Sequence, residues 1–119
     1  MDLKISGINA DSGLELCDGS EEIYIRSLRL YVSNMPGYLE KIKNVSKETL
    51  YDYAINVHGV KSISEYIGAE ETKKKAKELE LMAKGGDLAG VLAANEAFLQ
   101  NARNLVDKVR EWLEKNAAV

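Results

Sequence analysis

The only histidine of the chain, His58, lies in a stretch whose residue types could carry chemistry, Ala54 to Glu71. On a helical wheel at about 100° per residue, Lys61 falls one turn ahead of His58, on its core side. Ser62 falls four residues ahead, on the solvent side. An imidazole, an ammonium group and a hydroxyl therefore share one patch on the flank of the predicted helix.

This group of side chains suits the transfer of a phosphoryl group. A neutral imidazole is a good nucleophile near pH 7, and it can hold a phosphoryl group as a high-energy phosphoramidate. The ammonium group of Lys61 would offset the charge on the phosphoryl oxygens. Gly59 adds little crowding where a partner's active site would approach, although glycine costs roughly 1 kcal/mol of helix propensity relative to alanine.

The sequence lacks the residues that a metal site, a Ser–His–Asp hydrolase or a phosphate-binding loop would need. One histidine and one distant cysteine, Cys17, supply too few ligands for zinc or another transition metal. A Ser–His–Asp hydrolase needs a serine on an exposed turn and an oxyanion hole, whereas Ser62 and Ser64 lie on the helix of His58. The segment KGGDLAG lacks the Lys-Ser or Lys-Thr of a phosphate-binding loop. We therefore expect no metal, no cofactor and no autonomous enzyme.

A second stripe of the same helix leads up to the histidine. Tyr51, Ile55, His58 and Ser62 are spaced i, i+4, i+7 and i+11. A neighbouring helix could cover this stripe, or it could form an exposed docking patch. Spacing alone favours the covered arrangement. Glu65, one turn beyond Lys61, would either pair with that lysine or contact a partner.

Most apolar residues recur at helical spacing, which predicts an all-α protein. The expected helices are about Ala10–Cys17 with Asn9 as its cap, a helix from the cap Ser20 to about Val45 that Pro36 bends or restarts, a helix from the cap Ser46 to Gly68, one that starts at Glu70, and a long last helix from the cap Asp87. The core stripe of the third helix is expected to be Leu50, Tyr53, Ala54, Val57, Ser64 and Gly68. Such helices with tight turns predict an antiparallel four-helix bundle with short additional N-terminal helices.

Composition limits the class of protein further. The 119 residues fit one domain, and an apolar share of 45% is enough to fill a single core. The net charge of -3 argues against a nucleic-acid partner, which usually requires a basic face. The opening residues form no apolar signal segment, and no apolar run has the length of a membrane span. We expect a soluble, cytoplasmic protein that does not bind membranes.

The stretch VHGVKSISEYIGAEE resembles the signature of histidine-containing phosphotransfer (HPt) domains of bacterial two-component phosphorelays. The family pattern is a histidine, two residues and a lysine that glycine usually follows, then small residues and an ending like IGA or LGA. The matching positions are His58, Lys61, Ser64, Ile67, Gly68 and Ala69. The similarity continues upstream from Ile8 to Ile42 and downstream from Ala76 to Asp87, and so covers nearly the whole chain.

The resemblance implies a single HPt domain over residues 1–119, with the lead-in and first helices at about 9–45 and the bundle hairpins at about 46–116. His58 would be the phosphoacceptor and Lys61 would stabilise phosphate charge, whereas Tyr51, Ile55, Gly59, Ser62 and Glu65 would lie at the partner contact. The implied partners are response-regulator receiver domains, which bring their own Mg²⁺, and a sensor or hybrid histidine kinase. The chain itself would be a monomeric phosphoryl carrier.

The chain departs from the family pattern at two positions. Ser62 stands where glycine is usual, and Ile63 where a small polar residue is common. Serine is small enough for a receiver to approach, and its hydroxyl could bond a phosphoryl oxygen. The alternative function is an HPt-like helical interaction module without phosphotransfer activity.

Overall fold

The computed structural model describes residues 2–117, and within them the chain forms five α-helices and no strand. The helices are α1 (Ala10–Leu16), α2 (Glu21–Ile42), α3 (Leu50–Ile67), α4 (Glu70–Lys84) and α5 (Leu88–Asn116). The predicted all-α class is confirmed. None of the described helices combines the length and the apolar character that a membrane span needs.

Capping residues begin and end the helices largely where the sequence predicts them. The side chains of Asn9, Ser20 and Asp87 each accept a backbone N–H from the first turn of α1, α2 and α5, respectively. Such bonds satisfy donors that have no partner inside a helix. Gly68 ends α3 with φ at 79°, a left-handed conformation that residues with a Cβ adopt only at a cost.

Pro36 does not restart the chain, contrary to one of the two outcomes expected for it. Helix α2 is continuous from Glu21 to Ile42 and ends three residues before Val45. Pro36 is exposed, so the amide donor that it lacks is missing at the helix surface rather than in the core. Met35 and Leu39, both buried, hold the helix against its neighbours on either side of the proline.

The prediction that Ser46 caps the third helix is wrong. The cap is Thr49, and α3 begins at Leu50. The Thr49 hydroxyl oxygen accepts the Ser46 N–H at 2.8 Å, and the Thr49 N–H donates to the Ser46 carbonyl at 3.2 Å. These bonds close a separate turn ahead of the helix.

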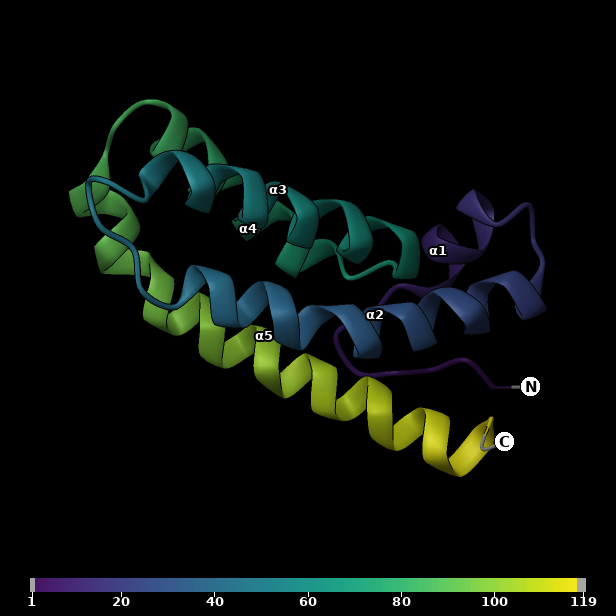
Figure 1. The fold of residues 1–119 in the computed structure, drawn as a ribbon. Coiled ribbons are helices and arrows are strands. Elements are labelled where there is room, and N and C mark those ends of the chain that lie inside the picture. The colour runs from purple at the N-terminus through teal and green to yellow at the C-terminus, as the bar shows by residue number, and fades with distance from the viewer. Residues whose placement is uncertain (1, 118–119) are drawn as a thin grey trace.

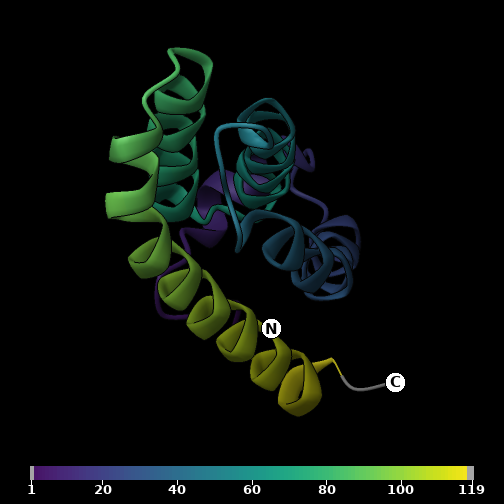
Figure 2. The same cartoon turned by 60° about the vertical axis from the view of Figure 1, so that its left-hand side comes forward.

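The four long helices contact one another in a ring, in which α2 packs on α3, α3 on α4, α4 on α5 and α5 on α2. Consecutive members run in opposite directions, with α3 and α4 above α2 and α5 in Figure 1. Figure 2 shows the same helices from another side, with the second half of α5 extending beyond α4. One core lies between them, and its fully buried larger side chains are Tyr24, Leu28, Tyr31, Met35, Ile42, Tyr53, Val57, Val60, Ile67, Val91, Leu99 and Val109.

The N-terminal segment fixes the end of the molecule at which α3 turns into α4. The Asn9 N–H donates to the Gly68 carbonyl at 2.8 Å, and α1 packs against α3 and α2. Leu3 and Ile5 are buried in the same core, and the Trp112 indole N–H donates to the Asp2 carbonyl at 3.2 Å. The Asn9 bond thus attaches the N-terminal segment to the turn between α3 and α4.

Candidate functional site

His58 lies in the middle of α3, on the edge of the helix that faces α4. The residues predicted for the core stripe of α3 are all buried, and Val60 and Ile67 join them. His58 falls outside this stripe, and 54% of its side chain is exposed. The imidazole therefore remains accessible from solvent, as the helical wheel predicts.

A buried carboxylate of α4 is the centre of the site. Only 5% of the Glu80 side chain is exposed, and three cationic or potentially cationic groups contact it. Its Oε2 lies 2.9 Å from Nδ1 of His58 and 2.8 Å from Nζ of Lys84, and its Oε1 lies 2.9 Å from Nζ of Lys61. Glu80 thus connects the candidate nucleophile to both neighbouring ammonium groups.

Glu80 is ionised at neutral pH. Burial alone raises its pKa, but hydrogen bonds from Lys84, Lys61 and His58 outweigh that effect and lower the pKa to about 2. An ionised carboxylate can only accept hydrogen bonds, so the bond to His58 assigns a proton to Nδ1. The other ring nitrogen, Nε2, then carries the free lone pair of the neutral imidazole.

The charges around the imidazole favour an anion. Two ammonium groups, those of Lys61 and Lys84, surround one carboxylate, which leaves an excess of one positive charge. Lys61 is only 23% exposed, whereas Lys84 is 62% exposed, so a bound group could reach Lys84 from solvent. A tetrahedral anion next to Nε2 would find these cations nearby.

An open groove of about 580 Å³ runs beside His58, between the start of α3 and the end of α4. We call it the His58 groove, and it is lined by Leu50, Tyr51, Ala54, Ile55, His58, Glu80, Ala83, Lys84 and Gly86. Its polar groups gather where the helices meet at Glu80, and most of its remaining wall is apolar. The groove brings two of the predicted partner residues, Tyr51 and Ile55, to the same place as the histidine.

The stripe that leads up to His58 is exposed, so the expectation that a neighbouring helix covers it is wrong. Tyr51 is 77% exposed and Ile55 is 54% exposed. Helix α3 packs on α2 and α4 with its other faces, which leaves this stripe without a helix above it. Tyr66, two turns beyond His58, is also 55% exposed, although it is not among the predicted residues of the stripe.

Ser62 and Gly59 make contacts within the protein. The Ser62 hydroxyl donates to the His58 carbonyl at 3.2 Å, a bond to the preceding turn that serine often makes in helices. A Cβ on Gly59 would lie 2.5 Å from Cε1 of Tyr38. The glycine therefore allows the tyrosine of α2 to pack closely on α3, and this packing accounts for its presence.

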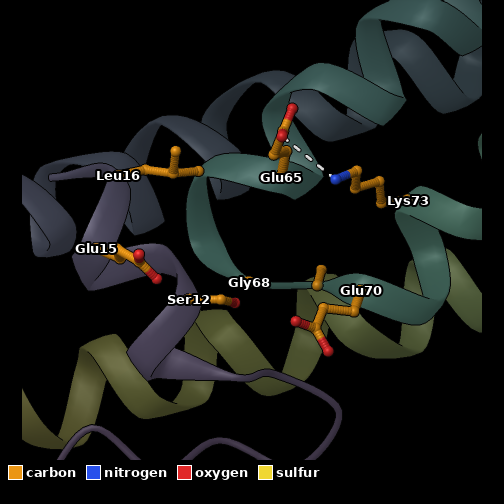
Figure 3. A pocket seen from close by; sticks show the side chains of 8 residues that line it. Ser12, Glu15, Leu16, Glu65, Gly68, Glu70 and Lys73 are labelled. Carbon is orange, nitrogen blue, oxygen red and sulfur yellow. Dashed lines mark hydrogen bonds and ion pairs between the residues drawn. The ribbon is translucent and has the colours of Figure 1, made fainter.

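Glu65 belongs to a different cavity. It pairs with Lys73 at 3.2 Å, not with Lys61 as one of the two expectations had it. Figure 3 shows this pair at a cavity of about 320 Å³ between α1, α3 and α4, where Glu15 and Glu70 also lie. His58 does not line this cavity, so Glu65 is separated from the His58 groove.

Sequence reasoning missed Glu80 and Lys84, although both left a signal. Glu80 stands four residues after Ala76 and three before Ala83, so it shares the buried side of α4 with two alanines. A glutamate in that position needs a partner. Lys84, four residues further on, is at the spacing of a helical ion pair.

No protein-family model matches the chain, and neither a curated protein nor a solved structure is detectably similar to it. Among residues 2–117 no group of three or more His, Cys, Asp or Glu side chains is arranged to hold a metal ion. The geometry around His58 is thus the main support for a function.

Proposed function

We propose that this protein is a histidine phosphotransfer carrier, in which His58 accepts a phosphoryl group from the phospho-aspartate of a receiver domain and passes it to another receiver. The observation that carries the proposal is the exposed imidazole whose Nδ1 is bonded to the buried carboxylate of Glu80. This arrangement prepares one ring nitrogen as a nucleophile and leaves it accessible to another protein.

The proposed transfer is an in-line displacement. Nε2 of His58 attacks the phosphorus, and the bond from phosphorus to the aspartyl oxygen breaks. The ring becomes positively charged as the N–P bond forms, and the Glu80 carboxylate at Nδ1 offsets this charge. Because phosphoryl transfer has a loose transition state with charge on the equatorial oxygens, positioning and nearby cations matter most. Lys61 and Lys84 supply those cations.

The way in which the helices pack against one another also supports the proposal. The ring of contacts among α2, α3, α4 and α5 suits an HPt-like antiparallel four-helix bundle, with α1 as an added N-terminal segment. A mid-helix histidine on such a bundle offers an exposed side chain to a receiver, which would bring Mg²⁺ and the catalytic groups. We propose accordingly that the chain is a monomer that works with receivers and a histidine kinase in a bacterial cytoplasm.

The second candidate is a helical interaction module without phosphotransfer. The exposed stripe of Tyr51, Ile55 and Tyr66 would suit either function, because both require a docking surface. Only the carrier requires the contacts of Glu80 with His58, Lys61 and Lys84. An interaction module has no need for an ionised carboxylate buried behind an exposed imidazole.

Transfer from a phosphorylated receiver distinguishes the two candidates. Receivers from one bacterial cell, each labelled on its aspartate, are mixed with the full chain, and the label on the chain is examined for its stability. A carrier acquires a label that is labile in acid and stable in alkali, and His58→Gln abolishes it while helical content stays the same. Equal labelling of His58→Gln would show that His58 is not the acceptor.

A further inference from the structure

The His58 groove combines a charged end with an apolar wall, and a small phosphorylated molecule with an apolar group would need both. At one end lie His58 and the ammonium group of Lys84, both in contact with Glu80. Away from them the wall is mostly apolar, formed in part by Tyr51, Ala54 and Ile55. A volume of about 580 Å³ is within the range of small-molecule sites.

We propose that His58 also takes a phosphoryl group directly from a small acyl phosphate, whose acyl group lies in the His58 groove. The inference rests on the proposed function, since it needs His58 as the phosphoacceptor. It adds a second donor class that requires no receiver domain. The chain could then be loaded from a low-molecular-weight pool as well as by a protein.

The charge arrangement favours this class of ligand. The phosphoryl dianion would lie by Nε2, next to the Glu80 carboxylate that Lys61 and Lys84 together outnumber in charge; of the two lysines, Lys84 lines the groove. The acyl chain carries no charge, and the apolar wall beside the cations suits it. Apart from His58 and Lys84 the lining of the groove contains no further cationic side chain, so the additional phosphates of a nucleoside polyphosphate would face a mostly apolar wall.

The chemistry of an acyl phosphate also matches the groups present. The lone pair of Nε2 forms the N–P bond while the bond from phosphorus to the acyl oxygen breaks, and the carboxylate departs with that electron pair. The ring begins neutral with its proton on Nδ1 and ends as a phosphorylated imidazolium beside Glu80. Charge balances without a proton transfer or a further reactant. A carboxylate leaves unprotonated at neutral pH, so the site needs no general acid.

The test uses the full chain with acetyl phosphate and benzoyl phosphate as donors, in the absence of any receiver. Intact-mass measurement follows the gain of one phosphoryl group, and His58→Gln is the blank. We expect labelling by both donors, with benzoyl phosphate faster by about fivefold to tenfold because its ring buries more apolar surface in the groove.

Matched variants locate the acyl group. Ile55→Ser removes an apolar side chain of the groove, and Leu92→Ser removes one of nearly equal exposure on α5, outside the groove. The preference for benzoyl over acetyl phosphate falls toward one in Ile55→Ser and persists in Leu92→Ser. Equal rates for the two donors in the unmodified chain, or a loss of preference in Leu92→Ser as well, would overturn the role of the groove.

A parallel arm separates this inference from the proposed function. The same preparation is mixed with a phosphorylated receiver to which it responds. Labelling by the receiver without labelling by either acyl phosphate disproves the small-molecule route and leaves the carrier function standing. Labelling of His58 by acyl phosphates alone, with no response to any receiver, supports the inference and removes the proposed partner. A chain that no donor labels contradicts both.

Discussion

Nδ1 of His58 lies 2.9 Å from Oε2 of Glu80, and this contact joins the exposed edge of α3 to the buried side of α4. The glutamate holds the ring orientation and assigns the proton to Nδ1, and in the proposed transfer it would face the charge that forms on the ring. If His58 is the proposed phosphoacceptor, this one contact would prepare it in three ways, and its removal has measurable consequences.

Glu80→Gln slows the phosphorylation of His58 by roughly tenfold, because a neutral amide replaces the charged acceptor at Nδ1. The rate is measured as label gained from a phosphorylated receiver, and nitrogen NMR of the imidazole reports the tautomer. Glu78→Gln is the matched control, since Glu78 is an exposed residue of the same helix with no ion pair to the described residues. Equal rates in the two variants would show that the glutamate contact does not prepare His58.

The pH dependence of stability follows from the lowered pKa of Glu80. Its pKa falls from an ordinary value of 4.5 to about 2 on folding, so the unfolded chain binds this proton first as the pH drops. The stabilisation is present above about pH 4.5 and is lost toward pH 2. Between neutral pH and about pH 3, the unmodified protein therefore loses more free energy of unfolding than Glu80→Gln. Urea titrations of both proteins give this difference, and parallel losses would refute the assigned pKa shift.

Lys61→Ala and Lys84→Ala each slow transfer to His58 and shorten the lifetime of the phosphoryl adduct, by about threefold to tenfold. Each change removes one of the cations near the phosphoryl oxygens and leaves the helix cores intact, so circular dichroism stays the same. Lys74→Ala, an exposed change on α4, serves as the control. Unchanged kinetics in both directions of transfer would exclude these lysines from charge stabilisation.

Replacing two buried tyrosines by phenylalanine is expected to have different effects on stability. The Tyr53 hydroxyl donates to Oδ1 of Asn95 at 2.8 Å, and Nδ2 of Asn95 donates to the Ile42 carbonyl at 2.8 Å. Tyr53→Phe breaks this network and destabilises the protein by about 1 kcal/mol. The buried Tyr31 hydroxyl has no hydrogen-bond partner among the described residues, so Tyr31→Phe is neutral or stabilising. Denaturant unfolding measures both variants, and an equal loss in the two would contradict this hydrogen-bond assignment.

Much of the helical framework could be predicted because its signals are local. Asn9, Ser20 and Asp87 cap helices through bonds to residues three positions away, and Gly68 ends α3 through its own backbone conformation. The exposure of His58 also follows from its place on one helix. Of the two outcomes predicted for Pro36, the restart of the chain is wrong, because buried contacts on both sides of the proline in α2 outweigh its local preference.

The remaining features of the candidate site depend on how the helices pack against one another. The spacing of residues along the sequence does not reveal this packing. The partner of His58 is Glu80, at a separation of 22 residues, and the contact exists only because of the rotation and register of α4 against α3. The same packing left Tyr51 and Ile55 uncovered and directed Glu65 to Lys73. A glutamate among alanines was the one sequence feature that pointed to the buried carboxylate.

The most direct test of the central claim is to identify the atom that carries the phosphoryl group after transfer from a receiver. Phosphorus and nitrogen NMR of the labelled chain distinguish Nε2 from Nδ1 of the imidazole. We predict an N–P bond at Nε2 of His58, with the Nδ1 proton still bonded to Glu80. A phosphoryl group on Nδ1 or on another residue, or no transfer from any receiver of the same cell, would contradict the account.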